Sequence, residues 1–109
     1  MFILTIDNLI IKYREDINYR LSNIYPSGPK SLLSPIKYVL CGMGKRFRPL
    51  LAILVAEACG GKKDDVISPA IAIEILHNFT LVHDDIMDQD LVRHGQETVH
   101  RKWDDGIAI

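Results

Sequence analysis

The chain has few cysteines and little excess charge, and each shortage excludes a class of protein. Its two cysteines, Cys41 and Cys59, form no CxxC pair and no zinc-ligand spacing, so we expect two reduced thiols in a cytoplasmic protein. The net charge of -1 at pH 7 gives the whole chain no attraction to nucleic acid or to acidic membranes. Any binding of anions must therefore come from local clusters of basic residues.

Neither a membrane span nor a targeting signal is visible in the sequence. The longest apolar run, Leu50 to Ala56, is stopped by Glu57, well short of the ~20 apolar residues that a spanning helix needs. The first residues contain no basic segment and reach an acid at Asp7, unlike a secretory signal peptide. The composition, 48% hydrophobic and 25% charged in 109 residues, predicts one small soluble domain or a piece of a larger one.

Four segments show helical periodicity, and none shows a convincing strand pattern, so the sequence predicts an all-α fold. The predicted helices run from about Thr5 to Ile24, from Ser34–Pro35 to about Cys41–Gly42, from about Pro49 to a stop at Gly60–Gly61, and from about Pro69 to Asp88. The fourth is apolar nearly all round, which is typical of a central helix. Residues 62–65 are predicted to form a charged turn, and residues 89–103 a polar loop.

The fourth helix ends in a cluster of acids, Asp84, Asp85 and Asp88. Asp84 and Asp88 are four residues apart and therefore lie on one face, about one turn from each other. Like charges repel there, and the helix dipole disfavours anions near the C-terminus by ~0.3–1 kcal/mol each. Converging carboxylates suit a hard cation such as Mg²⁺. Taken alone, the cluster could equally be a solvated helix end.

A basic loop precedes the third helix. Lys45, Arg46 and Arg48 lie within four residues and follow Gly42 and Gly44. Glycine allows a close approach of backbone to ligand, and arginine and lysine are the usual side chains that bind phosphate. The loop therefore predicts a phosphate-binding site, although a merely solvated turn has the same composition.

Further basic residues surround the acids. His77 lies within about 40° of Asp84 and Asp88 around the fourth helix at 100° per residue, so ligand contact and burial in the core are both open to it. Arg93 and His94 follow the acids, and this order suits a complex in which metal bridges carboxylate to phosphate and arginine neutralises the remaining charge.

These segments resemble one known family. Residues 44–49 (GKRFRP) are similar to the GKRxRP loop of polyprenyl synthetases, the trans-isoprenyl diphosphate synthases. Residues 81–88 (LVHDDIMD), followed by Arg93 and Gly95, are similar to their first aspartate-rich motif. The joint match covers about residues 42–103, and the likeness is closest to the geranylgeranyl diphosphate synthase type.

The resemblance implies a prenyltransferase with an all-α bundle of helices around a central cavity. Residues 1–109 would form the N-terminal part of this single domain. Isopentenyl diphosphate would be joined to an allylic diphosphate, and the enzyme would be a cytoplasmic homodimer without a membrane span. The implied Mg²⁺ ligands and catalytic residues are Asp84, Asp85 and Asp88, with Asp84 and Asp88 the direct ligands, and Arg93 would contact the allylic diphosphate. Lys45, Arg48 and His77 would bind isopentenyl diphosphate.

His94 departs from the family pattern, which has a second arginine at this position that helps to bind isopentenyl diphosphate. A histidine can still donate a hydrogen bond, and it does so more strongly when protonated. We therefore keep His94 in the predicted substrate site and expect weaker binding of isopentenyl diphosphate above neutral pH.

Product length in this family depends on residues just before the first aspartate. Phe79 and Thr80 lie five and four residues before Asp84, and a bulky ring with a small neighbour resembles the short-chain synthases, most closely those with C20 products. The alternative is that Phe79 is simply a core residue.

Two other functions remain open at this stage. A class I terpene cyclase shares the DDxxD motif but has no need of the second diphosphate site that Lys45, Arg48 and His77 would form. A non-catalytic helical subunit of a prenyltransferase would not need the acids to bind metal. Residues 104–109 resemble the first turn of a helix, and the family's second aspartate-rich motif is absent, so we expect a fragment that is inactive alone.

Overall fold

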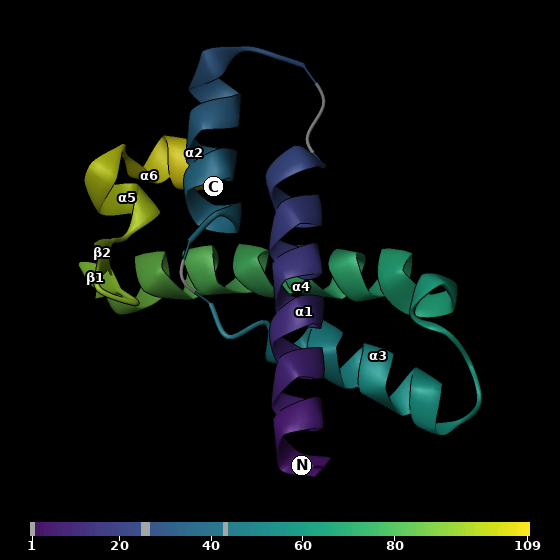
Figure 1. Ribbon diagram of the computed structural model, residues 1–109. Helices are drawn as coiled ribbons and strands as arrows, with labels where there is room; N and C mark the ends of the chain where they lie inside the picture. The colour runs from purple at the N-terminus through teal and green to yellow at the C-terminus, as the bar shows by residue number, and fades with distance from the viewer. Residues whose placement is uncertain (1, 25–26, 43) are drawn as a thin grey trace. The chain divides into compact units, whose positions relative to one another are not determined.

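The computed structural model describes residues 2–24, 27–42 and 44–109, which are largely helical (Figure 1). The helices are α1 (Phe2–Asn23), α2 (Lys30–Leu40), α3 (Phe47–Ala58), α4 (Lys63–Asp88), α5 (Val99–Lys102) and α6 (Asp105–Ala108), and the strands are β1 (Val92–Arg93) and β2 (Gln96–Glu97). The predicted all-α class is confirmed. Met43, which belongs to the predicted basic loop, lies outside the described residues.

The chain divides into two compact units. The first contains α1, α3 and α4 as far as Glu74, and the second contains α2, α4 from Ile75 onward, and the elements that follow it.

The core of the first unit is built on the predicted apolar stripe of α1, which packs against α3. Tyr13, Ile17 and Leu21 are buried at successive turns of α1, whereas Ile6 near its start is exposed. Burying a large apolar side chain contributes about 1.5–3 kcal/mol, so these turns hold α1 in place. The other buried apolar residues of the unit are Pro49, Leu50 and Ile53 of α3 and Ile67, Ala70 and Ile71 of α4.

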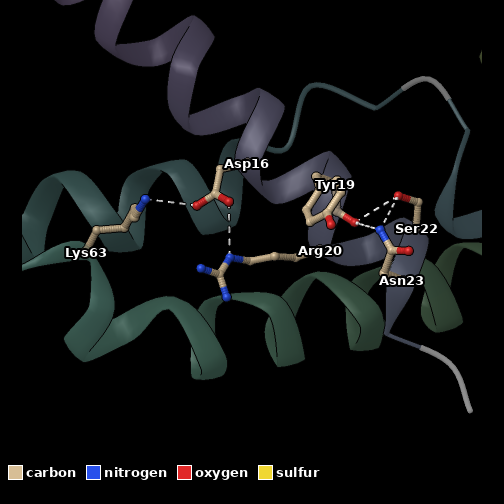
Figure 2. A network of polar contacts seen from close by, with 6 residues as sticks. All are labelled: Asp16, Tyr19, Arg20, Ser22, Asn23 and Lys63. Atoms are coloured by element: carbon tan, nitrogen blue, oxygen red, sulfur yellow. Dashed lines mark hydrogen bonds and ion pairs between the residues drawn. The ribbon is translucent and has the colours of Figure 1, made fainter.

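Polar contacts fix both the middle and the end of α1 (Figure 2). Asp16 lies between Arg20, whose Nε is 3.2 Å from Oδ1, and Lys63, whose Nζ is 3.0 Å from Oδ2. Lys63 begins α4, so this acid ties α1 to the first turn of α4. At the end of α1, Ser22 and Asn23 both donate to the carbonyl of Tyr19 at 2.8 Å, which satisfies a backbone acceptor of the last turn.

The ends of α3 follow the sequence closely. Gly60 has a left-handed φ of 90°, its amide donates to the Glu57 carbonyl at 3.0 Å, and the amide of Gly61 donates to the Ala56 carbonyl at 2.8 Å. This pair of bonds is the Schellman arrangement, so the predicted glycine stop is confirmed.

Two predicted helix starts were placed too late. Helix α2 begins at Lys30 and α4 at Lys63, so Pro35 and Pro69, which the sequence predicts in the first turn, lie inside the helices. In α4, Asp64 and Asp65 occupy the first turn, where the helix dipole favours acids, and Asp65 Oδ2 accepts the amide of Lys62 at 2.9 Å. Residues 63–65 are therefore helical rather than a turn.

Residues 89–103 are also more ordered than the predicted loop. The antiparallel strands β1 and β2 pair Val92 with Glu97 and Arg93 with Gln96. His94 and Gly95, which join them, have φ values of 50° and 76°. Two consecutive positive φ angles are those of a type I′ hairpin turn. Because histidine is not a usual residue of that turn, the sequence pattern did not predict the hairpin.

Helix α4 is long and apolar enough to cross a membrane when judged by length and composition alone, a test that the core helix of a soluble protein also passes. Only 22% of its most apolar stretch is buried within the described part of the chain. Ile73, Leu76 and Phe79 are each about half exposed, so the described elements leave apolar surface of α4 uncovered.

Candidate functional site

The acids at the end of α4 separate into two environments. Asp84 and Asp88 are exposed, whereas Asp85 is buried. Since α4 is helical through Asp88, Asp84 and Asp88 lie one turn apart on the same face. Two exposed carboxylates so arranged can share a hydrated cation.

Asp85 is bound by Arg93, a residue predicted to contact the substrate diphosphate. Arg93 Nε lies 2.8 and 3.0 Å from the two carboxylate oxygens, and Nη2 lies 2.7 Å from Oδ1. The Asp85 side chain is 5% exposed and that of Arg93 is 34% exposed, so the guanidinium still reaches solvent. The hydrogen bond to Asp85, aided by the charges of Asp85, Asp90 and Asp84, raises the pKa of Arg93 against the opposing effect of burial and keeps it charged.

The helix ends at these acids through an unusual backbone conformation. Gln89 has a left-handed φ of 56°, its amide donates to the Ile86 carbonyl at 3.2 Å, and the amide of Asp90 donates to the Asp85 carbonyl at 3.0 Å. This repeats the hydrogen bonds that end α3, with glutamine in place of glycine. A residue with a Cβ is strained there by about 1–3 kcal/mol.

The hairpin carries Arg93, which contacts Asp85, and the exposed His94 at its turn. Its base is closed by Thr98, whose Oγ1 donates to the Asp90 carbonyl at 2.9 Å and whose amide donates to the Leu91 carbonyl at 3.1 Å. From α2, Tyr38 Oη donates to the Glu97 carbonyl at 2.7 Å, and its ring meets Trp103 edge-on at 5.2 Å between centroids. The sequence did not predict this role of Tyr38, because no local pattern links residues 59 positions apart.

The basic loop has a different arrangement from the one its composition suggests. Lys45 and Arg48 are exposed, as a phosphate-binding role requires, but Arg46 is buried. Arg46 contacts Asn18 and Glu74, and the sequence did not predict either contact. Glu74 could have been noticed, because an acid within an apolar helix needs a partner.

The remaining predicted residues lie on α4. His77 is half-buried and its carbonyl accepts a hydrogen bond from Thr80 Oγ1 at 2.6 Å. Phe79 is 52% exposed, and its ring lies 4.2 Å from that of His83 between centroids. The exposure of Phe79 argues against the alternative interpretation, in which Phe79 is a core residue of this part of the protein. Its place in a product cavity stays a prediction.

The predicted site residues thus fall into two sets. Asp84, Asp85, Asp88, Arg93, His94 and His77 belong to the second unit, and Lys45 and Arg48 belong to the first. The acids and Arg93 come together within their unit, and convergence of the two sets around diphosphate stays a prediction. Among the described residues, no three Asp, Glu, His or Cys side chains form a metal cluster.

Comparisons with known proteins agree on one family. Residues 29–109 match the family model described as polyprenyl synthetase. Geranylgeranyl diphosphate synthase of Saccharolobus solfataricus is 42% identical over 106 residues, which cover 94% of this chain and 32% of that protein. The enzyme of the same name from Methanosarcina mazei is 38% identical over 110 residues, covering 100% of this chain and 34% of that one.

A solved structure of geranylgeranyl pyrophosphate synthetase from the archaeon Geoglobus acetivorans is similar in fold, with a TM-score of 0.87 and 40% identity. The match covers 93% of this chain and 33% of that one. The chain therefore spans about a third of the length of these relatives.

Proposed function

Because this chain belongs to the polyprenyl synthetase family, we propose that it forms the diphosphate-binding part of a prenyltransferase that joins isopentenyl diphosphate to an allylic diphosphate. The relatives that support this proposal are named as prenyl diphosphate synthases. Since the chain spans about a third of their length, the activity and substrates of the whole protein are part of the proposal.

The arrangement at the end of α4 carries the proposal. Proteins of this family generally depend on a divalent metal, and we assign Mg²⁺. Magnesium in phosphate-handling enzymes takes one or two carboxylates, keeps several waters and binds substrate phosphates. The exposed Asp84 and Asp88, one turn apart, fit that requirement without a third protein ligand. A direct metal bond from Asp85 stays a prediction, because both its oxygens accept hydrogen bonds from Arg93.

Each side chain then has a distinct part in the reaction. Asp84 and Asp88 would hold the metal, and Arg93, which Asp85 orients, would bind the allylic diphosphate. When bound, Mg²⁺ would supply the positive charge that stabilises the departing diphosphate. The allylic C–O bond breaks and its electron pair leaves with the diphosphate. The isopentenyl double bond attacks the carbocation, and the resulting cation passes a proton to the released diphosphate. Lys45, Arg48, His77 and His94 bind the diphosphate of isopentenyl diphosphate.

Calorimetry on the chain tests the metal site. Binding of a non-reactive allylic diphosphate analogue should require Mg²⁺, and Asp88→Asn should weaken it at least tenfold, because a charged ligand is lost. Asp64→Asn is the matched control, since Asp64 is an exposed acid at the opposite end of the same helix and should leave binding unchanged. Metal-independent binding, or equal effects of the two variants, would contradict the proposal.

The number of diphosphate sites separates a prenyltransferase from a class I terpene cyclase. A prenyltransferase binds two diphosphates, and the second site, at Lys45 and Arg48, uses side chains rather than metal. We expect isopentenyl diphosphate to bind without Mg²⁺. Its binding should be weakened by Lys45→Gln but not by Asp88→Asn. Binding that needs the metal, is lost in Asp88→Asn and is unaffected by Lys45→Gln would favour the cyclase, which has no need of a site at Lys45.

The chain itself should bind substrates without turning them over, because the family's second aspartate-rich motif is absent from its sequence. Incubation with radiolabelled isopentenyl diphosphate and an allylic diphosphate should yield no condensation product. Turnover by the chain would refute this expectation. If the chain binds neither diphosphate, that result would instead support the hypothesis of a non-catalytic subunit.

The product proposed is geranylgeranyl diphosphate, the C20 compound named for the relatives described above. Phe79 is the residue proposed to limit its length, with the small Thr80 beside it. In a catalytically competent form of the protein, Phe79→Ala should lengthen the products seen by chromatography, because removing the ring deepens the cavity. We further propose a cytoplasmic homodimer that neither spans a membrane nor binds nucleic acid.

A further inference from the structure

The middle residue of the basic loop is turned inward. The Arg46 side chain is 2% exposed, whereas its neighbours Lys45 and Arg48 are exposed. A buried guanidinium keeps its charge only where partners replace water. Arg46 therefore serves a different purpose from the two basic residues beside it.

The partners of Arg46 come from two helices of the first unit. Its Nε donates to Asn18 Oδ1 of α1 at 2.8 Å, and its Nη1 donates to Glu74 Oε1 of α4 at 3.1 Å. Glu74 is itself buried, with 5% of its side chain exposed. A single guanidinium thus joins α1, the start of α3, and α4, and all three residues lie within one unit.

The backbone of Arg46 is in a conformation that needs such support. Its φ and ψ are 55° and 35°, in the left-handed region, which is unfavourable for a residue with a Cβ. Its carbonyl accepts the amide of Leu50 at 3.1 Å and so begins the hydrogen bonds of α3. Just before it, the Lys45 carbonyl accepts a hydrogen bond from Arg14 Nε at 3.2 Å.

We propose that Arg46 is a positioning residue for diphosphate binding. Its buried ion pair with Glu74 holds the left-handed turn, and the turn directs Lys45 and Arg48 outward, where they bind isopentenyl diphosphate. The proposal rests on the function assigned above to Lys45 and Arg48. Arg46 itself does not contact the substrate.

A pair of variants separates positioning from simple stabilisation. Arg46→Met alone leaves Glu74 buried without Arg46 and should lower the melting temperature strongly. The double variant Arg46→Met/Glu74→Met removes both charges at similar volume, which commonly restores stability. If Arg46 only stabilises the fold, the double variant should regain both its stability and its affinity for isopentenyl diphosphate.

If Arg46 positions the loop, the double variant should fold but bind isopentenyl diphosphate about tenfold more weakly by calorimetry. Binding of the allylic analogue with Mg²⁺ should be unchanged, because Asp84 and Asp88 belong to the other unit. Wild-type affinity in the folded double variant would overturn the proposal. Should that variant not fold, Arg46→Lys keeps the charge but not the planar fork, and the same comparison applies to it.

A measurement without ligand distinguishes this proposal from the proposed function. Hydrogen exchange at the Leu50 amide reports the bond to the Arg46 carbonyl and should be at least tenfold faster in the folded double variant. Unchanged exchange would overturn the positioning role even if substrate binding changed. If the wild-type chain binds no isopentenyl diphosphate, the proposed function fails, and so does the inferred role of Arg46 in binding, whereas faster exchange would still show that Arg46 holds the turn.

Discussion

Arg93 donates hydrogen bonds to both carboxylate oxygens of the buried Asp85, eight residues before it, while Asp84 and Asp88 on the same helix remain exposed. Adjacent aspartates of one motif thus have different surroundings. Asp85 binds an arginine, and Asp84 faces solvent.

Substitution of the two adjacent acids should therefore have opposite signatures. Asp85→Asn removes the charge that orients Arg93 and should lower the free energy of unfolding by about 2 kcal/mol, less than for a fully buried pair because Arg93 is partly exposed. It should also weaken binding of the allylic analogue. Asp84→Asn, at an exposed position, should change stability by less than about 0.5 kcal/mol and abolish the metal dependence of binding. Urea unfolding and calorimetry measure both, and equal stability losses would contradict this division.

Tyr38 should stabilise the hairpin that carries Arg93, because it donates a hydrogen bond to β2. Tyr38→Phe deletes the hydrogen bond to the Glu97 carbonyl but keeps the ring that meets Trp103. We expect a loss of about 0.5–1 kcal/mol in unfolding free energy and faster hydrogen exchange across β1 and β2. Tyr19→Phe, at an exposed position on α1, is the control and should change neither measurement.

The stability of the first unit should fall in acid partly through Asp16. Burial acts to raise the pKa of Asp16, but hydrogen bonds and charges from Lys63 and Arg20 outweigh it and hold that pKa below its usual 3.8. The unfolded chain therefore takes up the proton first, and the stabilisation, present above pH 3.8, is lost as pH falls through the lower pKa of the folded state.

Asp16→Asn should consequently cost about 0.5–1 kcal/mol near pH 6, a value set by the partial exposure of the pair. The difference from wild type should shrink at a second pH below 3.8, where Asp16 begins to take up a proton. Urea unfolding at both pH values measures this. Asp7→Asn, an exposed change on the same helix, should leave the profile as in wild type, and a constant cost of Asp16→Asn at both pH values would refute the linkage.

His94 should make the binding of isopentenyl diphosphate depend on pH. An imidazolium adds a charged donor and a neutral imidazole does not, so the dissociation constant should rise from pH 6 to pH 8 in calorimetry. His94→Arg should remove this dependence and bind at least as tightly at pH 8. His94→Asn suits the left-handed turn position without carrying charge, and it should bind weakly at both values. A wild-type affinity that is constant or increases with pH would count against this role.

The sequence predicted those features that depend on local periodicity and local backbone chemistry. The three- and four-residue spacing of apolar residues in α1 predicted one buried face with Tyr13, Ile17 and Leu21. Gly60–Gly61 predicted the end of α3. It failed where a residue adopts a conformation unusual for its type. Gln89 and His94 both have left-handed φ values. Neither residue is the glycine or asparagine from which the end of α4 or the hairpin turn could have been predicted.

By itself, the sequence determined that α4 is a helix ending in acids and that Asp84 and Asp88 share one of its faces, because 3.6 residues per turn allow no other arrangement. Only the tertiary structure decided which charges of each motif face solvent and which are used internally. Asp85 and Arg46 are adjacent in sequence to exposed residues of the same charge, and their burial depends on Arg93 and Glu74, which lie eight and 28 positions away. Removing a charge from water is tolerable only where a partner is already in place, and the position of that partner is a property of the fold.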